Sequence, residues 1–212
     1  RFMGGYALTT GNQFMIWSYG LHALFDQSAK KVRDLKLSEI SPETGGSEVF
    51  PMRLMLHPND PNQLFGLYIR WQDHQYYLLK FDLENETFEK ILLPETEKLD
   101  GYQMEIEHGG KPAGGFGPKP YANTIIDNKI IMTYEPFNEA YIYNIGLDSL
   151  YLIYWDSKLT GNQNEYKLPK TVEMEQAEEH RRKYNESINF LPPRWDPISQ
   201  RFIRLSYKTI FG

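Results

Sequence analysis

Apolar and polar residues alternate along most of this chain, and the alternation recurs as one two-strand pattern in three places. Each copy has an alternating apolar strand, a polar turn that starts near an Asp or Asn, and a second alternating strand. The copies are residues 22–37, 76–93 and 140–155. A supersecondary unit repeated along a chain predicts a propeller or a β-solenoid.

The repeats predict an all-β fold, a β-propeller, because each extends to a unit of about four short antiparallel strands. The equivalent positions Phe25, Phe81 and Tyr143 are 56 and 62 residues apart, which exceeds the about 40–45 residues of a WD40 blade. A long loop between blades would account for the difference. The expected blades cover about residues 2–40, 50–95, 119–158 and 191–212.

The predicted architecture is a single domain, residues 1–212, with about three and a half blades of a larger ring. Ring closure protects the strand edges of a propeller, so a partial ring would be marginal or prone to aggregation alone. Strand-like sequence stands close to both ends without a polar tail. We therefore expect an incomplete piece of a propeller.

Two segments depart from the strand pattern. Residues 171–184 predict one surface helix, because acidic residues come first and basic residues last, as the helix macrodipole favours. Two i,i+4 ion pairs are expected on it, Glu178–Arg182 and Glu179–Lys183. Residues 109–120 contain five Gly and three Pro, which excludes a helix or a central strand. We expect a loop that overhangs the mouth of the propeller channel.

Composition and charge exclude several function classes. The net charge of −5 and the absence of a basic stripe argue against a nucleic-acid partner. The sequence has no apolar run long enough for a transmembrane helix. It has no cysteine, which excludes disulfides, thiolate chemistry and cysteine-based metal sites.

Catalytic motifs are absent from the sequence: it has neither a G-x-S-x-G nucleophile elbow nor an H-E-x-x-H zinc motif. Glu105, Glu107 and His108 are the nearest approach to an acid/base or metal cluster, and Asp73 is a candidate fourth member. They indicate either a solvated strand end or an active site. We predict no catalytic residue, no metal and no cofactor. A hydrolase or lyase acting on glycans or peptides at the channel mouth is the alternative, and a purely structural scaffold is a third possibility.

Arginine and aromatic residues gather at the predicted strand ends, and such clusters are typical of binding hot spots. The same residues could instead pack between blades, since most aromatic residues of β proteins are packed. The candidate binding residues are Arg70, Trp71, Phe116, Arg194, Trp195 and Arg204.

Two phrases of the sequence resemble a known family. Residues 190–205 read FLPPRWDPISQRFIRL, and residues 116–121 read FGPKPY, followed by an apolar strand at 128–134. Both resemble the TolB-like six-bladed propeller lipoproteins of Gram-negative bacteria, which carry no established catalytic residues. The likeness covers about the last half of the chain.

The resemblance implies a six-bladed ring, an export signal that ends in a lipidated cysteine, and a location in the cell envelope, in the periplasm or at the outer-membrane surface. This chain departs from the family by its three and a half units and its lack of cysteine. Truncation at both ends would explain both departures. The predicted function is a non-catalytic envelope module that binds a peptide, glycan or protein ligand at the propeller mouth.

Overall fold

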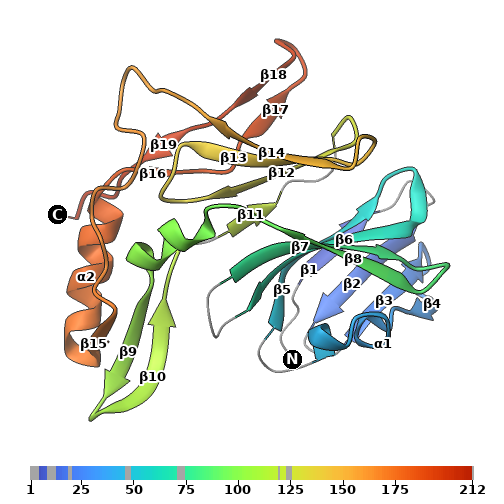
Figure 1. Cartoon of the computed structure of the whole chain (residues 1–212), viewed down its shortest axis with the longest axis horizontal. Helices are drawn as coiled ribbons and strands as arrows, with labels where there is room; N and C mark the ends of the chain where they lie inside the picture. Colours follow the sequence, from blue (N-terminus) through green and yellow to red (C-terminus); the bar gives the residue numbers. More distant parts are fainter. Residues whose placement is uncertain are drawn as a thin grey trace. The chain divides into compact units, whose positions relative to one another are not determined.

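The computed structural model describes residues 5–8, 13–18, 21–45, 49–70, 75–118, 120–122 and 126–211 (Figure 1). The chain divides into two compact units, Arg1–Thr96 (unit 1) and Glu97–Gly212 (unit 2). Strands form most of the regular structure in both units. Each unit is described by itself.

Unit 1 contains two four-stranded antiparallel sheets, and in each the strands neighbour one another in chain order. The first sheet has β1 (Gly5–Leu8), β2 (Gln13–Ser18), β3 (Leu21–Asp26) and β4 (Lys31–Asp34). The second has β5 (Val49–His57), β6 (Asp60–Arg70), β7 (Gln75–Asp82) and β8 (Thr87–Leu92). Helix α1 (Leu37–Ile40) and the 3₁₀ turn Pro42–Gly45 lie in the connection between the sheets.

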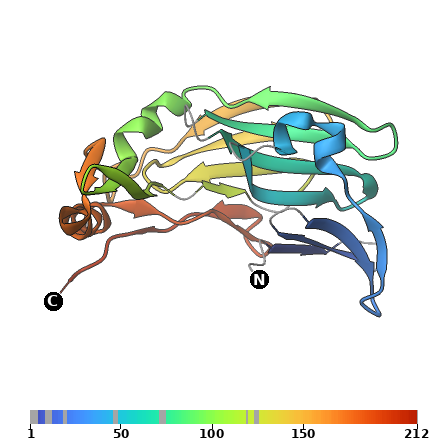
Figure 2. The ribbon, with the colours of Figure 1, turned by 90° about the horizontal axis from the view of Figure 1, so that it is seen from below.

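The apolar faces of these two sheets form one core. Met15 and Trp17 from the first sheet belong to the same buried cluster as Leu64, Tyr68 and Phe81 from the second. Figure 2 shows the two sheets of unit 1 as separate layers. Alternation along each strand sends every second side chain into this core, which is why the two-residue period was visible in the sequence.

The turns inside the sheets have the predicted chemistry. The Asp26 carboxylate accepts hydrogen bonds from the backbone N–H of Ser28 and Lys30 at 2.9 Å. Asp82 accepts from two N–H groups of its own turn at 3.0 Å, and Asn144 accepts from the Leu147 N–H at 3.1 Å. These short side chains replace the ladder hydrogen bonds that the backbone loses at the turn.

Unit 2 is built around a third four-stranded antiparallel sheet, whose strands again follow chain order. Its strands are β11 (Pro120–Ala122), β12 (Lys129–Tyr134), β13 (Glu139–Asn144) and β14 (Ser149–Tyr154). The hairpin β17 (Arg194–Asp196) and β18 (Arg201–Ile203) packs on it through Phe202, beside Ile131, Ala140 and Ile142. The short strands β16 (Asn189–Phe190) and β19 (Ser206–Tyr207) pair with each other.

A three-stranded sheet completes unit 2. Strand β9 (Met104–His108) lies between β10 (Lys111–Phe116) and β15 (Thr171–Glu173), and the pairing of β9 with β15 is parallel. The 3₁₀ helix Thr96–Tyr102 precedes β9, and α2 (Met174–Glu186) follows β15 directly.

The prediction of a loop over residues 109–120 was wrong for Lys111–Phe116, which form the edge strand β10. Gly109 and Gly110 make the preceding tight turn with positive φ of 59° and 73°. The register slips between Pro112 and Gly114. An edge strand tolerates proline because its outward N–H needs no ladder partner, so the composition excluded a central strand but not an edge.

The predicted helix is confirmed, although it begins three residues later because Thr171–Glu173 join the sheet as β15. The Glu179–Lys183 ion pair forms at 2.6 Å, as expected. The other prediction was wrong: Arg182 pairs with Glu186 at 3.0 Å, and Glu178 lies 3.8 Å from Arg181.

Three four-stranded units thus stand where the repeats predicted them, and the mainly β fold is confirmed. Part of the expected first strand of the third unit, residues 123–125, lies outside the described residues. The ring itself, and the assignment of the whole chain to one propeller domain, stay predictions.

Candidate functional site

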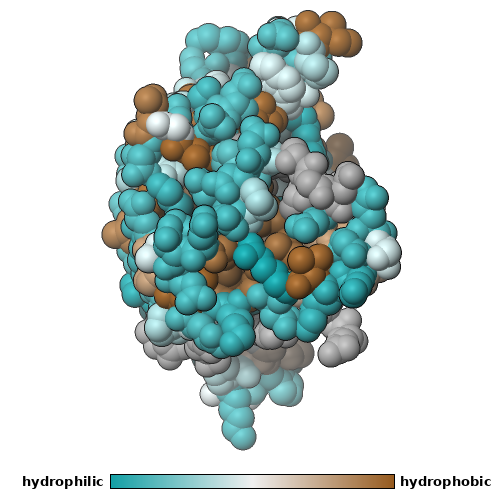
Figure 3. Space-filling model, turned by 90° about the vertical axis from the view of Figure 1, so that its right-hand side faces the viewer, coloured by the Kyte–Doolittle hydropathy of each residue, from teal (hydrophilic) through white to brown (hydrophobic). Residues whose placement is uncertain are grey.

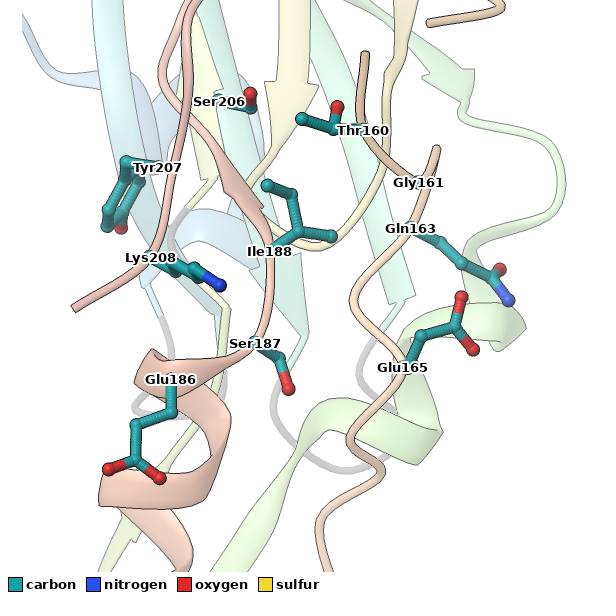
Figure 4. A pocket seen from close by; sticks show the side chains of 10 residues that line it. All are labelled: Thr160, Gly161, Gln163, Glu165, Glu186, Ser187, Ile188, Ser206, Tyr207 and Lys208. Atoms are coloured by element: carbon teal, nitrogen blue, oxygen red, sulfur yellow. The ribbon is translucent and has the colours of Figure 1, made fainter. Parts of the chain in front are cut away.

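An open groove of about 530 Å³ lies on unit 2, between three segments of the chain (Figure 4). One wall is a loop, residues 160–165, and the other is β19 with the residue after it, 206–208. The end of α2 and the residues that follow it, 186–188, lie between these walls. The volume falls in the range of small-molecule sites, about 300–1,000 Å³.

The loop wall is fixed by the fully buried side chain of Asn164. Its amide nitrogen donates to the Tyr184 carbonyl at 3.1 Å and to Oδ1 of Asn189 at 3.0 Å. Its amide oxygen accepts from the Tyr166 N–H at 2.9 Å, and its backbone carbonyl accepts from the Tyr102 hydroxyl at 2.6 Å. A buried amide with both ends satisfied holds its segment in one place.

The residues between the walls are held by Asn189, which is also fully buried. Its amide donates to the carbonyls of Tyr184 and Ser187, both at 3.2 Å. These carbonyls belong to the C-terminal turn of α2, which has no intrahelical partners for its last C=O groups. The Thr209 N–H donates to the Asn185 carbonyl at 2.7 Å and so joins the strand wall to the same turn.

The strand wall is anchored by Tyr207, whose hydroxyl donates to Oε1 of the buried Glu135 at 3.1 Å. The Tyr121 hydroxyl donates to the same oxygen at 3.2 Å. Burial, with the nearby Glu135 carboxylate, raises the pKa of Tyr207 to about 12 and raises that of Tyr121. Both phenols are therefore protonated at neutral pH and can donate to the carboxylate.

Arg204 fixes the chain just before this wall. Its guanidinium donates to the carbonyls of Leu191, Phe137, Glu139 and Tyr134 at 2.8–3.0 Å. Burial lowers its pKa to about 10, against the opposing effect of the Glu139 carboxylate, so it stays charged at neutral pH. Four of its five N–H groups are used in this way.

The backbone of the groove walls is therefore held in place, but several polar side chains of the groove have no hydrogen-bond partner within the described residues. Within the described residues, no hydrogen bond or ion pair engages the side chains of Gln163, Glu165, Ser206 and Lys208. Glu186, by contrast, accepts from Arg182 Nε at 3.0 Å. The groove can thus offer an amide, a hydroxyl, a carboxylate and an ammonium to a ligand.

The groove offers no activated nucleophile. The Ser187 hydroxyl donates to the Lys183 carbonyl at 3.3 Å rather than to a general base. The Tyr207 hydroxyl is bound to Glu135, and its ring turns away from Ile188 in Figure 4. The arrangement is suited to holding a polar ligand by hydrogen bonds and charge.

Three of the sequence-predicted binding residues lie around the β17–β18 hairpin. Arg194 is exposed on β17, and the Trp195 ring lies 5.1 Å from the ring of Phe202 in the core contact of that hairpin. The Arg204 guanidinium, besides its four hydrogen bonds, lies 5.8 Å from the Trp155 ring. The contacts of Trp195 and Arg204 stabilise the fold, and the predicted binding role of all three residues is untested.

Two of the remaining candidates lie on other described strands, Arg70 on β6 and Phe116 on β10. Arg70, in unit 1, donates to Oε1 of Gln75 at 2.9 Å, and Trp71 lies outside the described residues. Phe116 packs edge-on against Tyr184 at 5.3 Å, with Arg181 5.6 Å from its ring. Phe116 thus packs against the end of α2, and its predicted binding role is untested.

The suggested acid/base cluster is open to solvent. Glu105 and His108 are exposed on β9, and His108 Nδ1 lies 3.8 Å from Glu175. Asp73 lies outside the described residues. In the described part of the chain, no three His, Asp or Glu side chains gather closely enough to hold one metal ion. The hydrolase or lyase alternative stays a prediction.

Sequence reasoning missed the groove residues altogether. Their signal was weak: a polar connection of about 16 residues, 155–170, between β14 and β15. Connections longer than about 12–15 residues without regular structure are uncommon and often functional. That criterion alone would have singled out the loop wall, but not Ser206 or Lys208.

Figure 3 shows a largely hydrophilic face on which apolar residues form small patches. The most exposed apolar side chains, such as Leu147, Leu159 and Ile198, stand singly at turns and loops. No helix in the described residues is both long and apolar enough to cross a bilayer.

Comparison with known proteins identifies a family whose function is unknown. No curated protein and no solved structure matches the chain. The profile of one family, described as a domain of unknown function (DUF4221), matches residues 1–211. Because this match covers nearly the whole sequence, the chain belongs to the DUF4221 family.

Proposed function

We propose that this chain is a non-catalytic binding module of the cell envelope, and that the groove on unit 2 receives its peptide, glycan or protein ligand. One observation carries the proposal: the buried side chains of Asn164, Asn189 and Glu135 fix both walls of the groove and the residues between them by hydrogen bonds, while four polar side chains that line it have no hydrogen-bond partner within the described residues. Prepared polar groups on a fixed frame lower the entropic cost of binding.

The walls of the groove are rigid because the polar side chains that fix them are buried away from water. Asn164 and Asn189 are fully buried, and Glu135 is nearly so. Burying polar groups is tolerated only where hydrogen bonds replace those lost to water, and the result is a rigid local structure. Surface loops are usually more mobile than this. A rigid loop suits a site that must keep a fixed shape for a ligand.

The six-bladed propeller and the envelope location belong to the proposal as well. Two four-stranded meanders stack in unit 1, and a hairpin stacks on a third meander in unit 2. Blades of a propeller pack in this way. The envelope location rests on the resemblance of residues 190–205 and 116–134 to TolB-like lipoproteins, and is an analogy.

Blocking the groove tests the proposal. A Cβ at Gly161 would meet only the Gln163 carbonyl at 3.8 Å, so the backbone there has room for a side chain, and Gly161→Trp is chosen to place an indole in the groove. Gly114→Trp is the matched control, because nothing lies within 4 Å of its Cβ and it is outside the groove. Peptide and oligosaccharide panels would be titrated onto ¹⁵N-labelled protein and followed by NMR.

The proposal predicts shift changes that gather at residues 160–165, 186–188 and 206–208, and that disappear in Gly161→Trp but not in Gly114→Trp. Ligand binding that Gly161→Trp leaves intact would contradict it. The candidate binding residues from the sequence are tested alongside: loss of binding only in the triple variant Arg70→Ala, Arg194→Ala, Trp195→Ala would assign the ligand to those residues instead.

A further inference from the structure

We infer that the groove selects a short zwitterionic peptide, with its ammonium group at Glu165 and its carboxylate at Lys208. This inference rests on the proposed binding function and names the chemical class of the ligand. It follows from the signs and positions of the charges in the groove.

Three charged side chains line the groove, and only two of them are available. Glu186 is held by Arg182 at 3.0 Å. Glu165 and Lys208 make no ion pair or hydrogen bond within the described residues. Glu165 stands on the loop wall and Lys208 beyond β19, and Figure 4 shows them on opposite sides of Ser187 and Ile188. One available charge of each sign on opposite walls matches a ligand with separated opposite charges.

The neighbouring cations do not cancel the Glu165 charge. The Lys167 ammonium lies 3.6 Å from the Tyr102 ring centre. Burial lowers the pKa of Lys167, and the charge of Glu165, acting through space, offsets a part of this shift. No ion pair joins the two side chains. Lys183 is paired with Glu179 at 2.6 Å. The Glu165 carboxylate therefore remains available to a ligand ammonium group.

Other residues that line the groove can bind a peptide backbone. Gln163 and Ser206 supply an amide and a hydroxyl, which can donate to and accept from peptide groups. Ile188 gives an apolar surface between the walls for a small side chain. A neutral sugar would cover both charges without pairing either, and a desolvated, unpaired charge is costly.

The probe is trialanine with free termini, compared with its N-acetylated and C-amidated forms by NMR titration and calorimetry at low salt. We expect each blocked form to bind about three- to tenfold more weakly, the range of a partly exposed ion pair. Glu165→Gln should weaken free trialanine by a similar factor and leave the N-acetylated form unaffected. Lys208→Met should weaken free trialanine by a similar factor and leave the C-amidated form unaffected.

Matched controls come from the β9–β10 hairpin, where Glu105 and Lys111 are exposed and outside the groove. Glu105→Gln and Lys111→Met remove the same charges and should leave affinity within about twofold, as expected for distant surface charges. The double variant Glu165→Lys, Lys208→Glu should recover much of the affinity lost in each single reversal, because the peptide can then bind in the opposite direction.

The outcomes separate this inference from the proposed function. Trialanine affinity that is insensitive to end-blocking and to both groove charges would overturn the inference. A lack of trialanine binding at about 10 mM, well above a millimolar Kd, would do the same. If a neutral trisaccharide instead bound and Gly161→Trp abolished that binding, the inference would fail while the binding function stood. Ligand binding away from the groove would contradict both.

Discussion

The Tyr207 hydroxyl donates a 3.1 Å hydrogen bond to the Glu135 carboxylate, although 72 residues separate them in the chain. Tyr207 belongs to β19, a wall of the groove, and Glu135 directly follows β12 in the four-stranded sheet. The contact ties the wall to the core of unit 2. It also places a carboxylate where only hydrogen-bond donors make its burial tolerable.

Tyr207→Phe removes this donor and keeps the ring. Glu135 retains the Tyr121 hydroxyl at 3.2 Å, so we expect a loss of about 1–2 kcal/mol in the free energy of unfolding. Urea unfolding monitored by circular dichroism would measure it. Tyr151→Phe, an exposed tyrosine of β14, is the control and should change little. An unchanged unfolding midpoint in Tyr207→Phe would show that the contact carries no stability.

Stability should fall in alkaline solution above pH 10. Burial raises the pKa of Tyr207 and of Tyr102 to about 12 in the folded chain, from the ordinary value of 10.0. A raised pKa favours the protonated form in the folded state, so its stabilising effect is complete below pH 10 and is lost as the pH rises through about 12. The urea midpoint as a function of pH should show this fall.

The stability of the double variant Tyr207→Phe, Tyr102→Phe should fall less steeply over that interval, because two of the phenols with a raised pKa are gone. Absorbance of tyrosinate, followed in the folded protein, gives the second measurement. The number of tyrosines that ionise only near pH 12 should be smaller by two in the double variant than in the parent chain. Equal slopes in the two proteins would contradict the assignment of the effect to these phenols.

Arg204→Ala should be among the most damaging substitutions in unit 2. It removes the donor to four backbone carbonyls, and we expect a loss of about 3–5 kcal/mol. Arg204→Lys should recover only a part, because an ammonium cannot reproduce the planar fork. Arg201→Ala, on the exposed side of β18, should stay within about 0.5 kcal/mol of the parent. Chemical denaturation of the three variants makes the comparison.

Asn164→Leu should loosen the loop wall of the groove. The change leaves the Asn189 amide oxygen and the Tyr166 N–H without their partner, at a cost of about 2–4 kcal/mol. Amide hydrogen exchange of residues 160–166 should accelerate, and any groove ligand should bind more weakly. Gln176→Leu, on the exposed face of α2, also replaces an amide by leucine. It should change neither the exchange rates of residues 160–166 nor ligand binding. Unchanged exchange rates in Asn164→Leu would argue against a rigid wall.

Gly66→Ala tests the packing of unit 1. A Cβ at Gly66, in the centre of β6, would lie 2.2 Å from a ring carbon of Tyr68 and 2.9 Å from a methyl of Leu54. We expect a loss of about 1–3 kcal/mol from overpacking. Gly114→Ala, on the edge strand β10 with nothing within 4 Å, should be neutral or slightly stabilising. Thermal unfolding of each variant against the parent decides it.

The amino-acid sequence determined the local structure of this protein. Alternation at a period of two marked the strands around Phe25, Phe81 and Tyr143, because successive side chains of a strand point to opposite faces of its sheet. Asp26 and Asp82 marked the turns, because a short carboxylate bonds backbone N–H groups two or three residues away. These are interactions between near neighbours, which a linear pattern can display.

The tertiary structure alone decided the site. Tyr207 and Glu135 are 72 residues apart, and Asn164 and Asn189 are 25 apart, yet their contacts fix the walls of the groove. Nothing in the order of residues shows which buried amide or carboxylate will meet which partner. The same holds for Arg204: its place in the sequence did not indicate that the fold surrounds it with four carbonyls. Long-range hydrogen bonds depend on how the sheets stack, and that was decided only in three dimensions.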